Sequence, residues 1–234
     1  MLESWRWFGP DDPVSLENIV QAGARCIVSS LHQIPTGAAW PEDEIDSRKR
    51  EIESWGLQWG VVESIPVHNA IKTASGDYRT YIDNYKLSLQ RLGDAGIEVV
   101  CYNFMPVVDW TRTNLDYALP NASRALRFEM TDFVAYDVYI LERAGAAADY
   151  TEALLSAARE RLALMSDQEK TLLEKNIIAG LPGGEGSYDR AGILEAIQEF
   201  IQLGEAGLRK NLFNFLEELI PVAEAAGIRM CIHP

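Results

Sequence analysis

One repeating pattern constrains the fold of this chain more than any other feature. A helical stretch, a glycine and a short apolar run follow one another four times, in QAGARCIVSSLH, SWGLQWGVVESIPVH, DAGIEVVCYNFMP and AAGIRMCIHP, around Gly23, Gly56, Gly96 and Gly227. Each glycine lies where the end of a helix favours a residue that tolerates positive φ. The apolar runs show little alternation, which is typical of strands buried on both faces. The pattern therefore predicts an α/β fold with a parallel sheet.

The segments between these runs supply the predicted helices. Amphipathic stretches predict helices at 15–22, 42–55, 78–95 and 208–226, and the opening WRWFG predicts one further strand. Because proline cannot donate a helical hydrogen bond, we expect Pro221 to kink the last of these helices.

The glycine spacing predicts a large insertion. The first three glycines are 33 and 40 residues apart, whereas the fourth follows after 131. We interpret residues 106–206 as a mainly helical insertion within one domain spanning 1–234. Its predicted helices cover 125–141, 150–165, 166–179 and 193–202, with a capping box at Ser166 and Glu169 and a glycine-rich linker at 181–188.

The number of units is too small for a complete barrel. An eight-stranded (β/α)8 TIM barrel needs roughly 250 residues without large insertions, and only five strands are predicted here. The last of them stops at His233 and Pro234, with no helix behind it. We therefore expect the chain to be the N-terminal portion of a longer TIM barrel, truncated after the fifth strand. An independent open sheet of five strands is the alternative, although its last strand would then expose an unprotected edge.

The acidic composition excludes several functions. With 21 basic and 35 acidic residues the net charge is −14, which argues against nucleic-acid backbones and anionic membranes as partners. No apolar run approaches the roughly 20 residues that cross a bilayer, and the chain does not open with a secretion signal. We expect a cytoplasmic protein in which Cys26, Cys101 and Cys231 are reduced.

Polar residues gather where the predicted strands end, which is where barrel enzymes carry their active sites. His32, His68 and His233 all lie there, together with Glu63, Asn103 and Asp109. Simpler interpretations exist, since a loop histidine often hydrogen-bonds the backbone and Glu63 could pair with an arginine or lysine. His233 is well placed to hold a divalent metal, but a metal needs three or four ligands, and no HxxxH, HxH or CxxC motif is present.

Several segments resemble the mannonate dehydratase family, whose members are xylose-isomerase-like TIM barrels. They are WRWFGP at 5–10, DPV at 12–14, LHQIP at 31–35, VES at 62–64, CYNFMPV at 101–107, DWTRT at 109–113, NIIAGLP at 176–182 and RMCIHP at 229–234. The resemblance implies a lyase of hexuronate catabolism that dehydrates D-mannonate to 2-keto-3-deoxy-D-gluconate. It also implies Mn²⁺, Fe²⁺ or another divalent metal as cofactor, and a homodimer.

The same resemblance assigns roles to individual residues. It makes His233 the first metal ligand, while the family's other ligands come from later strands. The family's catalytic histidine and tyrosine also come from later strands, so no catalytic residue is expected in this chain and all of them are expected beyond Pro234. The present chain alone is therefore expected to be inactive. Cys231 is not the family's ligand cysteine, because in a strand it points to the same side as His233 but one layer deeper.

The expected substrate pocket contains five further residues, namely His32, Glu63, Asn103, Trp110 and Arg112. Arg112 suits the substrate carboxylate because a guanidinium can bind it through two parallel hydrogen bonds. Two alternatives stay open: another metal-dependent sugar isomerase or epimerase on the same barrel, and an inactive scaffold fragment.

Overall fold

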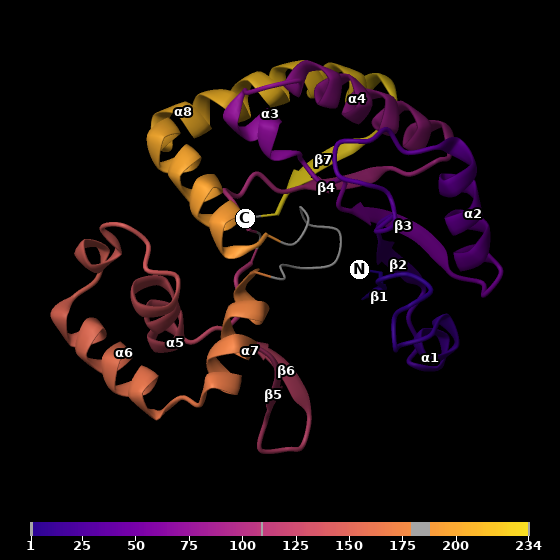
Figure 1. The fold of residues 1–234 in the computed structure, drawn as a ribbon. Coiled ribbons are helices and arrows are strands. Elements are labelled where there is room, and N and C mark those ends of the chain that lie inside the picture. The colour runs from indigo at the N-terminus through magenta and orange to yellow at the C-terminus, as the bar shows by residue number, and fades with distance from the viewer. Residues whose placement is uncertain (1, 109, 179–187, 234) are drawn as a thin grey trace. The chain divides into compact units, whose positions relative to one another are not determined.

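The computed structural model describes residues 2–108, 110–178 and 188–233 (Figure 1). These residues form two compact units. The first comprises the described residues of 1–106 and 202–234, and the second comprises those of 107–181 and 186–201. None of the described helices is long and apolar enough to cross a membrane.

A parallel five-stranded sheet forms the centre of the first unit. Its strands are β1 (Ser4–Arg6), β2 (Cys26–Ser29), β3 (Gln58–Glu63), β4 (Val99–Tyr102) and β7 (Arg229–Ile232). They lie side by side in the order β1-β2-β3-β4-β7 (Figure 1). The prediction of a parallel sheet is confirmed, including the strand in WRWFG. The described strands make an open sheet, and no closed barrel is seen in this part of the chain.

Helices cover one side of that sheet. They are α1 (Leu16–Gln21), α2 (Glu42–Glu53), α3 (Asn69–Thr73), α4 (Tyr78–Asp94) and the later part of α8 (Arg190–Ala225). Ser15 caps α1 in a capping box with Asn18. The core of this unit includes Ile27, Val62 and Val100 from the strands and Phe215 and Leu219 from α8, all fully buried.

The prediction that the strands are buried on both faces holds for β2, where the neighbouring residues Cys26 and Ile27 are both buried, but not for β4. In β4, Val100 and Tyr102 are buried, whereas Val99 and Cys101 are only half-buried. The cause is visible in Figure 1, where α2, α4 and α8 run along the same side of the sheet. The opposite side is therefore open enough to carry polar groups.

The second unit combines a hairpin with helices. Its elements are β5 (Asn114–Ala118), β6 (Arg124–Arg127), α5 (Met130–Ala135), the π-helix η1 (Tyr136–Ile140), the 3-10 helix η2 (Ala146–Asp149), α6 (Glu152–Leu164), α7 (Asp167–Ile178) and the start of α8. The predicted helices at 150–165 and 166–179 correspond to α6 and α7. Ser166 and Glu169 form the predicted capping box.

The predicted helix at 125–141 is wrong at its beginning. Residues 124–127 form β6, which pairs antiparallel with β5 through partners such as Tyr117 and Ala125. The helical preference of this segment is overridden by strand pairing. Residues 181–187 of the predicted linker at 181–188 lie outside the described residues.

Gly204, and not Pro221, interrupts α8. The backbone leaves the helical region at Gly204, with φ 67° and ψ 172°, and stays within it at Pro221. A proline can bend a helix while its own backbone angles stay helical, so the expected kink at Pro221 stays a prediction. The break lies at Gly204 because glycine alone adopts such angles readily, and it separates the two helices predicted at 193–202 and 208–226.

Candidate metal and substrate site

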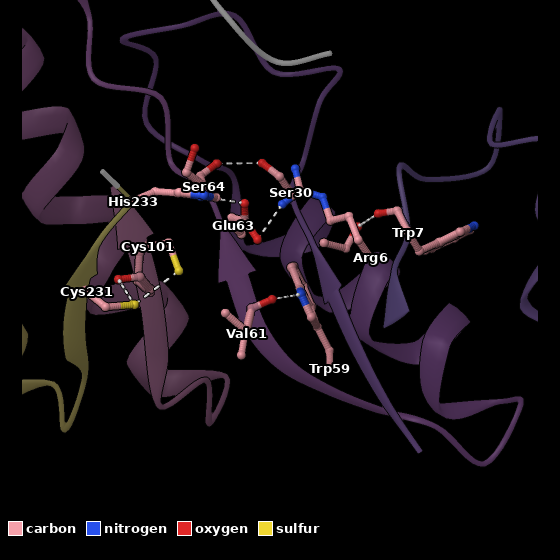
Figure 2. Close-up of polar contacts among 12 residues, drawn as sticks. Arg6, Trp7, Ser30, Trp59, Val61, Glu63, Ser64, Cys101, Cys231 and His233 are labelled. Atoms are coloured by element: carbon pink, nitrogen blue, oxygen red, sulfur yellow. Dashed lines mark hydrogen bonds and ion pairs between the residues drawn. The ribbon is translucent and has the colours of Figure 1, made fainter. Parts of the chain in front are cut away.

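At the carboxyl end of the sheet, the Glu63 carboxylate contacts two other ionisable side chains, those of His233 and Arg6. Its Oε1 atom lies 2.9 Å from Nδ1 of His233, and its Oε2 atom lies 3.0 Å from Nη1 of Arg6. Figure 2 shows the three side chains on one side of the sheet, with Glu63 in the middle. Arg6 ends β1, Glu63 ends β3 and His233 follows β7. Parallel strands thus bring together residues that are far apart in sequence.

The backbone and Glu63 together fix the position of His233. Its amide N–H donates to the carbonyl of Tyr102 at 2.8 Å, which extends the pairing of β4 with β7. Its side chain is 40% exposed. A carboxylate at Nδ1 is the partner that orients metal-binding histidines and directs Nε2 to the metal, so the geometry fits a metal ligand.

The described residues do not complete a metal site. Among them, no group of three or more histidine, cysteine, aspartate or glutamate side chains could hold an ion. The simpler interpretation of Glu63, that it pairs with a basic residue, is confirmed by Arg6. The contact with His233 shows that Glu63 also reaches the candidate metal ligand.

The expected catalytic residues are not tested by this structure. They were expected beyond Pro234, and Pro234 itself lies outside the described residues, which end at His233. The expectation that this chain carries no catalytic residue therefore stays a prediction.

Two thiols lie beneath the group around Glu63. Cys101 and Cys231 are paired in register on β4 and β7, and their Sγ atoms are 3.1 Å apart as free thiols. Figure 2 shows Cys231 on the same side as His233 and deeper along the strand, as the strand period predicts. Burial raises the pKa of Cys101 to about 12, so this thiol is protonated at neutral pH.

His32 lies close to two guanidinium groups. Both of its ring nitrogens are shielded from solvent. Burial lowers the pKa of His32 to about 4, and the positive charges of Arg6 and Arg48 act in the same direction. The imidazole is therefore neutral at pH 7, which suits a hydrogen-bonding role better than a charged one.

His68 has the simpler role. Its Nδ1 atom accepts a hydrogen bond from the amide of Ala70 at 3.0 Å, which caps α3. Its ring stacks on Tyr81 with 3.9 Å between ring centroids. The interpretation of His68 as a histidine that hydrogen-bonds the backbone is confirmed.

A cavity of about 420 Å³ lies beside His32. It is lined by the segment that follows β1, by His32 and Gln33, and by α2. Glu63, Asn103 and His233 do not line it. Of the residues predicted to bind substrate, only His32 contributes to this cavity.

The remaining predicted site residues fall in different units. Asn103 follows β4 in the first unit and is buried. Trp110 and Arg112 belong to the second unit, where Nη1 of Arg112 donates to the carbonyl of Thr111 at 3.0 Å. Asp109 lies outside the described residues. The roles of Asn103, Trp110 and Arg112 in substrate binding stay predictions.

Sequence reasoning missed Arg6. The available signal was its position between Trp5 and Trp7 in the first strand. Because side chains alternate along a strand, Arg6 must point away from the side on which Trp7 is buried.

Comparisons with known proteins identify the family. The family described as D-mannonate dehydratase (UxuA) matches residues 1–234. The chain is 63% identical to a mannonate dehydratase of Saccharophagus degradans and 53% identical to mannonate dehydratase 2 of Agrobacterium fabrum, over all of its own length and 59% of each relative.

A solved structure of the same family also matches this chain. The crystal structure of mannonate dehydratase from Streptococcus suis serotype 2 matches with a TM-score of 0.69 and 34% identity, over 100% of this chain and 52% of that one. The chain thus spans about 59% of the length of the curated relatives that it matches. With the match extending from the first residue to the last, the chain belongs to the D-mannonate dehydratase (UxuA) family.

Proposed function

We propose that the complete protein containing this chain dehydrates D-mannonate to 2-keto-3-deoxy-D-gluconate. We further propose that it is a cytoplasmic, divalent-metal-dependent homodimer of hexuronate catabolism. Family membership over all 234 residues supports the reaction. The single structural observation that carries it is the contact of Glu63 with both His233 and Arg6 at the carboxyl end of the sheet.

The fold supports the same proposal. In TIM barrels, parallel strands that are neighbours in sequence are also neighbours in space, and helices cover the outside. The order β1-β2-β3-β4-β7 has this arrangement, with the second unit inserted between β4 and β7. We propose that these strands are the first five of such a barrel, and that the catalytic residues come from strands that follow Pro234.

The proposed reaction removes one water molecule. A base takes the proton from C2, the C3 hydroxyl is protonated and leaves as water, and the resulting enol tautomerises to the 2-keto acid. Removing a proton next to a carboxylate places a second negative charge on the same group, so stabilisation of that charge governs the barrier.

Two residues of this chain would help to hold the metal ion that stabilises this charge. Glu63 accepts a hydrogen bond from Nδ1 of His233, which fixes the imidazole tautomer and directs Nε2 outward. His233 would be one ligand of Mn²⁺, Fe²⁺ or a similar ion, and the other ligands would come from elsewhere in the protein. When bound, the ion would offset the negative charge that forms on the substrate carboxylate.

The test is an assay of the full-length protein with D-mannonate and Mn²⁺, in which NMR identifies the product. The variant His233→Asn should lose bound metal, measured by elemental analysis, and at least about 100-fold in kcat/KM. Arg229→Gln is the matched control, since Arg229 lies at the opposite end of β7 in an exposed pair with Glu98. It should retain both metal and activity.

The other outcomes are equally clear. If His233→Asn keeps its metal and its turnover, His233 is not a ligand. If the wild-type protein interconverts sugars but leaves D-mannonate unchanged, it is an isomerase or epimerase of the same barrel. If it binds no metal and turns over neither class, the scaffold interpretation holds.

A further inference from the structure

We infer that Arg6 binds the carboxylate of the sugar-acid substrate and so determines specificity for acids over neutral sugars. This inference rests on the proposed function, because it assumes that a sugar acid occupies the site beside His233. It replaces Arg112, the residue that sequence reasoning favoured for the carboxylate, with a residue that the structure places next to the candidate metal ligand.

The first step concerns which cations are present. Arg6 is the last residue of β1, and Arg48 donates to the carbonyl of Ser30 directly after β2, so both guanidinium groups lie at the carboxyl end of these strands. An acidic protein with a net charge of −14 repels an anionic substrate unless local cations offset that charge. A cationic side chain in this region would therefore add to the charge compensation that the proposed metal ion supplies.

Arg48 is fully engaged in holding the fold together. Its Nη1 donates to the carbonyl of Ser30 at 3.0 Å, its Nε pairs with Glu51 at 3.3 Å, and its guanidinium lies over the ring of Trp7. Its side chain is only 6% exposed. A guanidinium held on three sides in this way is a structural group.

Arg6 resembles Arg48 in pairing with a glutamate, Glu63, and in lying 5.0 Å from an aromatic ring centroid, that of Phe8. It differs in its exposure, since its side chain is 28% exposed, and in making no hydrogen bond to a backbone carbonyl among the described residues. A guanidinium carries five N–H donors in a planar fork, and Glu63 approaches that of Arg6 at Nη1. The buried Nε of Arg6 has no hydrogen-bond partner among the described residues. The geometry leaves Arg6 able to take a second carboxylate.

The position of Arg6 fits the substrate. Glu63 contacts His233 through one oxygen and Arg6 through the other, so Arg6 is separated from the candidate metal ligand by a single carboxyl group (Figure 2). The reacting carbon C2 is bonded to the substrate carboxylate. A residue that binds this carboxylate must therefore lie close to the metal, and Arg6 also offsets the charge of Glu63, which would otherwise repel it.

The experiment compares two ligands of nearly the same shape, one with a charged carboxylate and one with a neutral carboxamide in its place. The full-length, metal-loaded enzyme is titrated with D-mannonate and with its neutral amide, D-mannonamide, and the two Kd values are compared. We expect Arg6→Gln to raise Kd and KM for D-mannonate by roughly 10- to 100-fold, the value of a charged hydrogen-bonded pair. The Kd for the amide should change by less than about threefold, and Arg6→Lys should restore part of the preference.

Two further variants separate specificity from structure. The double variant Arg6→Gln/Glu63→Gln removes both charges, so no carboxylate is left without its cation, and it should still lose the preference for the acid. Arg112→Gln tests the competing assignment and should keep the preference. Metal content is measured for each variant, since a purely structural role of Arg6 would lower metal content and weaken both ligands equally.

Three results would overturn the inference. They are equal weakening of both ligands in Arg6→Gln, an unchanged preference in that variant, and loss of the preference in Arg112→Gln alone. Failure of the proposed function gives a different result, in which the wild-type enzyme does not convert D-mannonate. The Kd values for the acid and the amide then still test whether Arg6 binds the carboxylate. A wild-type protein that binds neither ligand overturns both the proposed function and the inference about Arg6.

Discussion

At the scale of single residues, His32 shows how burial changes the chemistry of a side chain. Burial, with Arg6 and Arg48 nearby, lowers its pKa to about 4 in the folded protein, against 6.5 for an ordinary histidine. Between these two pH values the unfolded chain binds a proton that the folded chain does not. His32 therefore lowers the free energy of unfolding as the pH falls from about 6.5 towards 4.

The variant His32→Gln removes this proton uptake. When the pH is lowered from 6.5 to 4.5, we expect the free energy of unfolding to fall by about 1 kcal/mol less in the variant than in the wild type, after allowing for the partial exposure of His32. Urea denaturation at several pH values measures the difference, and carboxylates that titrate in the same range are common to both proteins. NMR titration gives an independent check, and a His32 ring that titrates near pH 6.5 would contradict the prediction.

At the scale of elements, local signals predicted most of the first unit. The cap glycines and apolar runs located the strands, and α2 and α4 begin at the predicted residues. The hairpin of β5 and β6 was missed because RALR at 124–127 has good helix formers and becomes a strand only by pairing with β5. The turn signal Pro120-Asn121 preceded it and was the available clue.

The break in α8 makes a prediction at this scale. Gly204 has φ 67° and ψ 172°, and a Cβ there would meet no atom within 4 Å. The cost of Gly204→Ala is therefore in the backbone alone, and we expect a loss of about 1–3 kcal/mol in the free energy of unfolding. Ala206→Gly, at an exposed position two residues later, controls for ordinary helix propensity and should cost at most about 1 kcal/mol. Equal or greater stability of Gly204→Ala would show that α8 tolerates a continuous helix here.

At the scale of the whole molecule, the candidate site depends on contacts that no local pattern encodes. Glu63 and His233 are 170 residues apart, and Arg6 reaches Glu63 across the intervening strand β2. The sequence predicted that polar residues end these strands, but which of them touch is set by strand order and register. For this reason His233 and Glu63 were each identified as candidates, whereas the direct contact between them and the choice of Arg6 as the ion-pair partner of Glu63 were not.

The same long-range assembly depends on a close approach between α4 and the end of α8. A Cβ built at Gly93 would lie 2.5 Å from the backbone carbonyl oxygen of Ala226, so one of the two backbones must shift to accept it. In an ordinary helix, Gly→Ala stabilises a protein by about 0.4–1 kcal/mol. At Gly93 we expect the opposite sign, a loss of about 1–3 kcal/mol measured by urea denaturation, because overpacking against backbone outweighs the helix preference.

The matched control for this prediction is Gly192→Ala near the start of α8. A Cβ there approaches Oδ1 of Asp189 at 3.1 Å, so this side chain needs to move by only a few tenths of an ångström and can keep its hydrogen bond from the Gly192 amide. This variant should be neutral or slightly stabilising. If Gly93→Ala were as stable as Gly192→Ala, α4 and α8 would not pack as closely as the structure shows. The position of β7, which follows Ala226 and leads to His233, would then not depend on the contact at Gly93.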